Sequence, residues 1–370
     1  MESKRLLIFH PGIAFYRVDL FNDLCKDFHT RVCLEYSYIE DPKAYHELIA
    51  RHYTFQPSYT GKMSKWGQMK YAVRQIRNFS PDVVLVSEFN LMAVASILYR
   101  FFTRQKYRVV SICDDSYDMV VNDNDFSRSH RLARRLLASR LDELILVEPK
   151  VMQWYRQRYD RGWCFPIIRR EETLRQQYEA ALPLSRQYEA EYELRGQRVF
   201  LFVGRLVRLK NVHTLIRAFH AAQLTQARLV VVGSGEEEDN LKQLAGELHE
   251  EVIFTGRLTG HALYAWYNVA DCFVLPSTQE AFGAVTNEAM IAGCRCLVSE
   301  LAGSQCLVKE GVNGAVFNPH DVADLTEKIR LTYASLPPRH LDVLRPSTMV
   351  WDYECEIEKL IERLHKLAER

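Results

Sequence analysis

The stretch LPSTQEAFGAVTNEAMIAG, residues 275–293, joins an apolar strand to a helix. We expect the strand to end near Leu275, a Pro-Ser turn to follow, and the helix to begin near Gly283. Glu280 then lies in the loop, and Glu288 lies on the helix eight positions later. A strand that feeds directly into a helix is typical of an α/β fold.

The start of this helix could bind a ligand. The N–H groups of Phe282, Gly283 and Ala284 would have no acceptor within the helix, and glycine lets a ligand approach the backbone closely. With one carboxylate on each side, these amides could hold both ends of a phosphorylated polyhydroxyl ligand. The alternative is that Glu280 and Glu288 are ordinary surface glutamates.

Two earlier turns have related features. In FVGRLVRLKN (202–211) a strand ends at Gly204, and Arg205 and Lys210 follow it. Ligands bind at the carboxyl ends of strands in open α/β sheets, so two cations there could bind a diphosphate or be solvated surface charges. In VVGSGEEEDNL (231–241) two glycines and an acidic first helical turn fit a helix cap as well as a ligand contact.

Short apolar runs alternate with helical patterns along the chain and fall into two series. Near-continuous apolar runs are typical of parallel strands that helices cover on both faces. We therefore predict an α/β protein with two doubly wound domains. The expected strands are residues 5–10, 31–39, 82–87, 107–113 and 143–148, then 198–204, 227–233, 251–256, 272–277 and 295–299, and clear helical patterns cover 64–78, 90–102 and 127–139.

A polar stretch divides the two series. Residues 171–195 are rich in helix formers and predict a helical connector that leads into the second domain. We place the first domain at residues 1–165, the second at 166–346 and a final helix at 347–370.

The composition is that of a globular protein. Hydrophobic residues make up 48% of the chain, which excludes general disorder. The 48 Lys and Arg against 47 Asp and Glu give a net charge of +1, so we expect no nucleic-acid partner. Nine irregularly spaced cysteines without a zinc-binding set favour a reducing, cytoplasmic location. The apolar run at 6–9 is too short for a signal peptide, and no apolar stretch is long enough to span a membrane.

Several motifs occur together in a consistent order: Gly204-Arg205 with Lys210, VVGSGEE, VIFTGRL, and EAFGAVTNEAMIAG followed by LVKEGVNGAVF. Together they resemble glycosyltransferase family 4, whose signature is two glutamates separated by seven residues, as at Glu280 and Glu288. The resemblance is close over about residues 198–335, and the N-terminal half matches only in outline.

This resemblance implies a GT-B fold, in which two Rossmann-like domains face a cleft, with a nucleotide-sugar donor on the C-terminal domain and the acceptor on the N-terminal one. It implies retaining transfer without a metal or other cofactor. Arg205 and Lys210 would hold the diphosphate and stabilise the leaving group, Glu280 would contact the sugar, and Glu288 the ribose. The other donor-binding positions that it implies are Gly12, Gly204, Phe282, Gly283 and Ala284.

The sequence departs from the family pattern at several positions. Asn211 and Ala281 stand where glycine is usual, and Cys294-Arg295-Cys296 replaces a Gly-x-Pro turn. Many relatives carry a histidine after the strand at 107–112, whereas this chain has Cys113, Asp114 and Asp115. Either aspartate could act near the reacting sugar, and we take Asp114 as the candidate; alternatively, both cap the loop.

Further polar residues of the N-terminal half have simpler interpretations. His10 and Arg17, which flank Gly12, could line the cleft, although a histidine at a strand end is more often a satisfied core or rim residue. The Asp-x-Asp pattern in NDND (122–125) could bind a metal in another glycosyltransferase fold, but here we interpret it as a polar loop.

Positive charge is concentrated in the N-terminal half. Residues 1–165 carry +6 and the remainder −5. The segment SRSHRLARRLLASRL (127–141) predicts an amphipathic helix with an apolar stripe of Leu132, Leu136 and Leu137. It could pack on the core and leave a solvated basic face, or it could lie on an anionic membrane.

The motifs and the family resemblance together imply a retaining, metal-independent glycosyltransferase, which we expect to move a sugar from a nucleotide diphosphate to a glycan or lipid-linked acceptor in cell-surface polysaccharide synthesis. We expect it in the cytoplasm, with attachment to the inner face of the membrane as a further hypothesis. A nonhydrolysing nucleotide-sugar epimerase is disfavoured by the paired glutamates. A catalytically silent sugar-nucleotide-binding or scaffold protein is disfavoured because Arg205, Lys210, Glu280 and Glu288 are all present.

Overall fold

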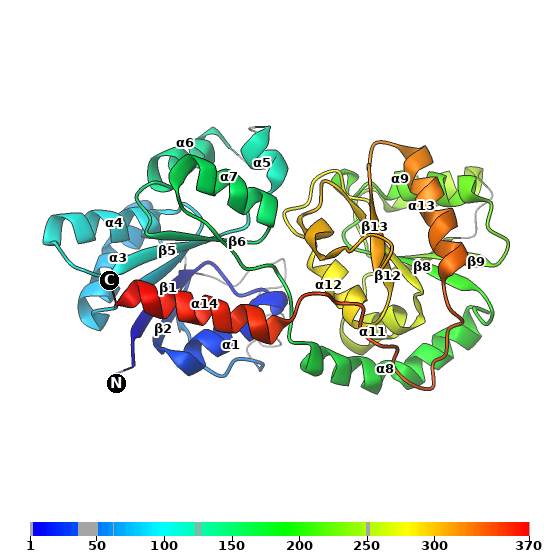
Figure 1. Cartoon of the computed structure of the whole chain (residues 1–370), viewed down its shortest axis with the longest axis horizontal. Coiled ribbons are helices and arrows are strands. Elements are labelled where there is room, and N and C mark those ends of the chain that lie inside the picture. The colour runs from blue at the N-terminus through cyan, green and yellow to red at the C-terminus, as the bar shows by residue number, and fades with distance from the viewer. Residues whose placement is uncertain are drawn as a thin grey trace. The chain divides into compact units, whose positions relative to one another are not determined.

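The computed structural model describes residues 3–35, 51–61, 63–122, 124, 127–248 and 252–369. The chain divides into two compact units, shown in Figure 1. Unit 1 comprises Met1–Ile167 and Tyr353–Arg370, and unit 2 comprises Ile168–Asp352. The final helix, α14 (Tyr353–Ala368), therefore belongs to unit 1, and it begins six residues after the position 347 that we expected.

In its described part, unit 1 contains a seven-stranded parallel sheet in the order β3-β2-β1-β4-β5-β6-β7. The β4 strand reads VVLVS and is buried along its whole length, as expected for a strand covered on both faces. The strands are β1 (Arg5–His10), β2 (His29–Leu34), β3 (Ser58–Tyr59), β4 (Val83–Ser87), β5 (Arg108–Cys113), β6 (Glu143–Leu146) and β7 (Trp163–Cys164).

Helices cover both faces of this sheet. The helices α3, α4, α6 and α7 contribute to one hydrophobic core with β4, β5 and β6, while α1 packs against α14. The unit 1 helices are η1 (Phe15–Arg17), α1 (Val18–Asp27), α3 (Lys65–Phe79), α4 (Leu91–Thr103), α5 (Tyr117–Val121), α6 (Arg128–Leu137) and α7 (Pro149–Tyr159), besides α14.

Local sequence explains where three of these helices begin. Ser64, Asn90 and Ser127 precede α3, α4 and α6, and each side chain accepts a hydrogen bond from a backbone N–H of the first turn. Such caps satisfy donors that have no acceptor inside the helix. The helices predicted at 64–78, 90–102 and 127–139 are confirmed within two residues at each end.

Unit 2 repeats the same topology. Its described part contains a six-stranded parallel sheet in the order β10-β9-β8-β11-β12-β13. In both units the first strand lies beside the second and the fourth, which is the doubly wound arrangement. The strands are β8 (Arg198–Val203), β9 (Ala227–Val232), β10 (Val252–Gly256), β11 (Cys272–Leu275), β12 (Arg295–Ser299) and β13 (Gly314–Phe317).

Two groups of helices flank this sheet. The helices α9, α10 and α13 pack with one another, and α8 packs against α11 and α12. The unit 2 helices are α8 (Glu171–Glu191), η2 (Arg208–Lys210), α9 (Val212–Ala222), α10 (Glu238–Glu247), α11 (Gly260–Val269), α12 (Ala284–Ile291), η3 (Gly303–Leu307) and α13 (Val322–Ser335).

The predicted doubly wound α/β fold is confirmed. The sequence missed β3, β7 and β13, which are two to four residues long and too short to show a clear pattern. Parts of the expected strands at 31–39 and 251–256, and of the NDND loop, lie outside the described residues. The predicted connector at 171–195 is the single helix α8, which continues through Pro183 and packs on α11.

The sequence left two positions open for α6, packed on the core or lying on a membrane, and of its predicted apolar stripe the structure buries only Leu137. Leu132 and Leu136 are 58% and 50% exposed, whereas Arg134 is buried. The Arg134 guanidinium donates to the Met119 carbonyl at 3.3 Å and lies 5.5 Å from the ring centre of Trp154. These contacts compensate for the desolvation of the charge, so α6 buries an arginine and exposes two leucines.

No helix in the described ranges combines the length and the apolar character that crossing a bilayer requires.

Candidate functional site

In unit 2 the structure brings Lys210 and Glu280 together. Lys210 ends η2, which follows β8, and Glu280 lies in the loop after β11, the strand adjacent to β8. The Lys210 ammonium forms an ion pair with the Glu280 carboxylate, and both side chains are largely buried. Arg205 follows Gly204 in the same loop and is exposed. The two predicted cations and the first predicted glutamate thus lie at the carboxyl edge of this sheet, where α/β folds bind ligands.

The unusual Asn211 fixes this loop. Its φ of 57° lies in the left-handed region, which explains a preference for glycine at this position. Asparagine tolerates this conformation, and here its side chain also makes useful bonds. The Asn211 amide donates to the carbonyl oxygens of Pro276 at 3.1 Å and Pro319 at 2.9 Å, and its oxygen accepts from Thr214 at 2.8 Å. Asn211 therefore joins the loops that follow β8, β11 and β13.

The glycines of GSG serve close backbone packing. A Cβ at Gly233 would lie 1.8 Å from the Gly204 carbonyl oxygen, and a Cβ at Gly235 would lie 2.4 Å from the Leu206 carbonyl oxygen. No side chain fits at either position. These two residues hold the loop after β9 against the loop after β8, which carries Arg205.

Gly283 begins α12 as the sequence predicts. It is the N-cap with φ 93°, and Ala284 is the first helical residue. Phe282 is buried beside it, and Glu280 forms an isolated parallel bridge with Ala302. The N-terminal end of α12 carries the positive end of the helix dipole and favours an anion. It lies beside Glu280, because a Cβ at Gly283 would be 3.3 Å from Glu280 Cγ.

Glu288 lies on α12 one helical turn beyond this N-terminal end. Its carboxylate accepts a hydrogen bond of 3.0 Å from the Tyr267 hydroxyl. Burial raises the pKa of Glu288 above its usual value, and the charge of Arg169 and the Tyr267 bond offset part of this increase. Tyr267 and Arg169 are positioning partners that the sequence analysis did not identify, because they lie far from the motif in sequence.

In unit 1 His10 is an interior residue. It ends β1, and the Gly12 N–H approaches its Nδ1 at 3.4 Å. Burial, and then the charge of Arg17, lower the pKa of His10 to about 3. The imidazole is therefore neutral at physiological pH. This agrees with the interpretation of His10 as a core or rim residue whose polar atoms are hydrogen-bonded within the protein.

Asp114 lies at the carboxyl end of β5. Its carboxylate forms an ion pair with the buried guanidinium of Arg17, and about a third of the Asp114 side chain remains exposed. Its backbone N–H donates to Glu88 Oε1 at 2.8 Å. The structure thus brings Asp114 and Arg17 together, and it leaves one carboxylate accessible at this edge of the sheet.

Asp115 has a different environment. It is 1% exposed, accepts a hydrogen bond from the Tyr155 hydroxyl, and lies 3.9 Å from an Arg134 nitrogen. Of the two aspartates, only Asp114 has a carboxylate that a ligand could reach, because Asp115 is buried in the interior.

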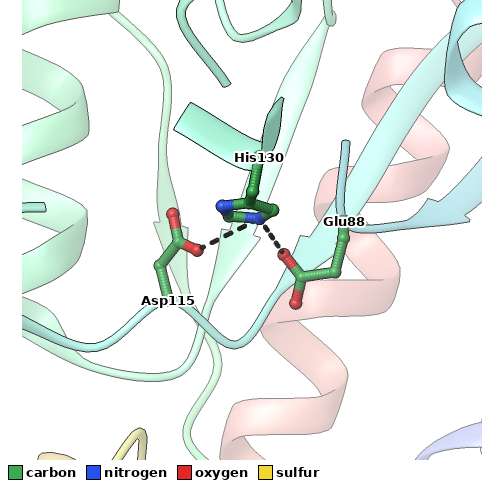
Figure 2. Close-up of side chains that lie close together, drawn as sticks. All are labelled: Glu88, Asp115 and His130. Atoms are coloured by element: carbon green, nitrogen blue, oxygen red, sulfur yellow. Dashed lines mark ion pairs between the residues drawn. The ribbon is translucent and has the colours of Figure 1, made fainter. Parts of the chain in front are cut away.

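Glu88, which accepts from the Asp114 N–H, also belongs to a polar cluster with Asp115 and His130 (Figure 2). His130 Nε2 is 3.8 Å from Glu88 Oε2 and 4.0 Å from Asp115 Oδ1, and the three side chains point toward one another. Among the described residues it is the one group of His, Cys, Asp and Glu side chains close enough to share an ion. Burial is the main cause that raises the pKa of Glu88 to about 7. The sequence analysis missed Glu88 and His130; the polar residue directly after the apolar strand β4 was the available signal.

Comparison with known proteins agrees with this arrangement. Residues 186–340 match the sequence family of glycosyl transferases group 1. Unit 2 carries a group 1 glycosyl transferase domain. The predicted family resemblance is thereby confirmed for the part of the chain that holds the paired glutamates.

Relatives of this glycosyl transferase domain match over limited lengths. An uncharacterized glycosyltransferase of Methanocaldococcus jannaschii is 40% identical over 121 residues, which are 32% of this chain and 31% of that protein. A D-inositol 3-phosphate glycosyltransferase of Mycobacterium sp. is 37% identical over 140 residues, 36% of this chain and 31% of that protein. The matched stretch thus spans about a third of the curated relatives.

Solved structures match over nearly the whole chain. Anabaena HepE in complex with UDP and glucose has a TM-score of 0.74 at 18% identity and covers 98% of this chain and 100% of its own. Sucrose-phosphate synthase from Thermosynechococcus elongatus has a TM-score of 0.71 at 18% identity, covering 98% and 99%. The fold of this chain is therefore GT-B, as predicted.

Proposed function

We propose that this chain is a retaining glycosyltransferase that uses a UDP-sugar as its donor. The observation that carries the proposal is the Lys210–Glu280 pair beside the N-terminus of α12. The choice of UDP is supported by the GT-B neighbour HepE, which was solved with UDP and with UDP-glucose.

The Lys210–Glu280 ion pair would position Lys210 to bind a diphosphate. Before the donor binds, the Glu280 carboxylate holds the Lys210 ammonium in place. A diphosphate brings more negative charge than one carboxylate, so it would draw Lys210 and the exposed Arg205 toward itself. The Glu280 carboxylate would then be available to accept hydrogen bonds from sugar hydroxyls.

Bond breakage between the sugar and the diphosphate would increase negative charge on the leaving phosphate. Lys210, Arg205 and the α12 dipole would stabilise that charge because they are positioned before the reaction begins. This assignment gives the protein's own cations the role that a metal ion has in other transferases, and we therefore propose a metal-independent reaction.

The two glutamates would divide recognition of the donor. Glu280 lies in the loop before α12 and would contact the sugar. Glu288 lies further along the helix, oriented by the Tyr267 hydroxyl, and would contact the ribose. Gly204, Phe282, Gly283 and Ala284 would bring backbone close to the donor, and Gly12 of unit 1 would do so from the other domain.

We assign the acceptor to unit 1, with Asp114 as the candidate residue near the reacting sugar. We further propose a glycan or lipid-linked glycan as the acceptor, in cell-surface polysaccharide synthesis. The basic character of unit 1 supports an acceptor with an anionic group, such as a lipid diphosphate.

Titration calorimetry with UDP, GDP and ADP, followed by turnover assays with the matching sugar nucleotides, tests the proposal. We expect UDP to bind most tightly, and EDTA to leave turnover unchanged. Failure of all three nucleotides to bind would contradict the donor site. UDP binding without transfer to any acceptor or water would favour the catalytically silent alternative, and a C2-epimerised sugar nucleotide as product would favour the epimerase.

A further inference from the structure

Three neighbouring helices of unit 1 have an unusual charge. Together α3, α4 and α6 contain nine Lys and Arg residues and no Asp or Glu, and all of the nine except Arg134 are at least partly exposed. α3 packs against α4, and α4 and α6 contribute to the same core on the same face of the sheet. We call the solvent-facing side of these three helices the basic helical face.

On α4 the exposed side is apolar. Leu98, Phe101 and Phe102 follow the i, i+3, i+4 spacing that places side chains on one side of a helix, and the two phenylalanines are 75% and 76% exposed. The opposite side of α4 is buried in the core. A helix that is apolar on all sides is typical of a protein interior or a membrane, and α4 has only one side in the interior.

The flanking helices combine apolar and basic side chains. On α6 the exposed residues Arg128, Leu132, Arg135 and Leu136 share one side at spacings of three to four residues. On α3 Trp66 is 74% exposed, and the exposed residues Lys70 and Arg74 follow it on the same side. The helices α3 and α6 thus each expose bulky apolar side chains beside lysine or arginine side chains.

We propose that the basic helical face binds the surface of a bilayer that contains anionic phospholipid. Phenylalanine, tryptophan and leucine would enter the boundary between headgroups and acyl chains, and the lysines and arginines would contact lipid phosphates. The charge disfavours a second copy of this chain, because two basic faces repel each other. The aromatic groups and cations of this face could also contact RNA, but the exposed leucines Leu98, Leu132 and Leu136 cannot stack on bases, so we favour lipid.

This proposal specifies which surface would contact the membrane, which the sequence-based hypothesis could not do. That hypothesis rested on the positive charge of residues 1–165 and on the amphipathic pattern of 127–141, with Lys62, Lys65, Lys70 and Arg74 as further basic residues of that half. Lys62 lies outside the described residues, and the structure adds the exposed apolar groups of α4 and α6, which charge counts could not show. The inference does not need the proposed transferase activity, although a docked unit 1 would bring its expected acceptor site to lipid-linked substrates.

Cosedimentation of the full chain with phosphatidylcholine vesicles, with and without phosphatidylglycerol, tests the proposal. We expect binding to the anionic vesicles that weakens as salt rises. Phe101→Ser with Phe102→Ser should reduce the binding constant by roughly tenfold or more, because two exposed aromatic groups that would enter the bilayer are lost. Leu132→Ser with Leu136→Ser provides a second, independent variant on α6.

The matched control is Leu331→Ser with Val343→Ser, which removes two exposed apolar residues of unit 2 and should bind vesicles like the wild type. Thermal unfolding of every variant reports whether the mutated unit remains folded, and UDP calorimetry separates this proposal from failure of the donor assignment. The proposal is overturned if the wild type does not bind anionic vesicles at low salt, if both variants bind like the wild type, or if Phe101→Ser with Phe102→Ser instead dissociates a dimer or abolishes RNA binding.

Discussion

The Glu88 carboxylate accepts a hydrogen bond of 2.8 Å from the backbone N–H of Asp114. This bond joins the carboxyl ends of β4 and β5, two adjacent strands of unit 1. Glu88 itself has a φ of 57°, its N–H donates to the Ile112 carbonyl, and its carbonyl accepts from the Ser111 hydroxyl. A non-glycine residue in the left-handed region costs about 1 kcal/mol or more, so these bonds hold Glu88 in a conformation that it would not adopt alone.

Glu88 should act on catalysis through Asp114. Glu88→Ala removes the acceptor, and the loss of one hydrogen bond to a charged group, about 1.5 kcal/mol, corresponds to a roughly tenfold decrease in kcat. The KM for the donor should not change, because Glu88 is not among the residues that we assign to donor binding. Glu88→Gln keeps an oxygen acceptor and should recover most of the activity. An equal loss in both variants, or a changed donor KM, would contradict this role.

Lys210→Ala should lower kcat about 10²–10³-fold, the typical cost of losing one preorganised group that stabilises transition-state charge. Arg205→Ala should act in the same direction. Arg208→Ala is the matched control, because Arg208 is an exposed cation on the same short helix as Lys210. Steady-state kinetics with a UDP-sugar provide the measurement, and comparable losses for Arg208→Ala and Lys210→Ala would show that only the general charge of the loop matters.

Glu280→Gln and Glu288→Gln should separate sugar recognition from ribose recognition. Glu280→Gln should lower turnover and leave the affinity for UDP nearly unchanged, because UDP lacks the sugar. Glu288→Gln should weaken UDP binding, and Tyr267→Phe should weaken it less, since Tyr267 orients the Glu288 carboxylate. Calorimetry with UDP distinguishes the two glutamates. Equal losses of UDP affinity would disprove this division of roles.

Glu148, which precedes α7, should make stability depend on pH. It is 1% exposed, and burial raises its pKa from 4.5 to about 7, an increase that the Lys150 charge reduces. Below pH 4.5 both folded and unfolded chains bind the proton. As pH rises to about 7 the unfolded chain releases it first, so the free energy of unfolding falls. At 1.36 kcal/mol for each pKa unit, the full effect above pH 7 is about 3 kcal/mol.

Glu148→Gln should remove this loss. The variant should gain stability relative to the wild type as pH rises from 5 to 8, as measured by the thermal unfolding midpoint at each pH. Glu358→Gln, at an exposed position of α14 in the same unit, is the control and should show no such trend. A constant difference between Glu148→Gln and the wild type across this range would refute the assignment.

The sequence predicted unit 2 better than unit 1, for a physical reason. The candidate residues of unit 2 lie in short turns directly after strands, and parallel strands place those turns at one edge of the sheet. Arg205, Lys210, Glu280 and Gly283 could therefore be grouped from sequence order alone. The Lys210–Glu280 ion pair also depends on β8 and β11 being adjacent, which sequence spacing does not show.

The environment of the unit 1 aspartates depends on tertiary contacts. Asp114 and Asp115 are neighbours in sequence, yet one pairs with Arg17 and remains accessible while the other accepts from Tyr155 in the interior. The burial of only one residue of the α6 stripe, Leu137, depends on tertiary contacts for the same reason. Periodicity assigns leucine to the core and arginine to solvent, but the pocket formed by Trp154, Met119 and Asp115 accepts Arg134.

Asn211 has a kinetic consequence. By bonding the carbonyl groups of Pro276 and Pro319, it fastens the Lys210 loop to its neighbours before any ligand arrives. Local opening of the Lys210 loop requires both bonds to break together. The amide hydrogens of this loop should therefore exchange with solvent about as slowly as those of the buried strand β8. The donor would then meet a site that needs no ordering, and its association would be limited by diffusion and orientation rather than by loop folding.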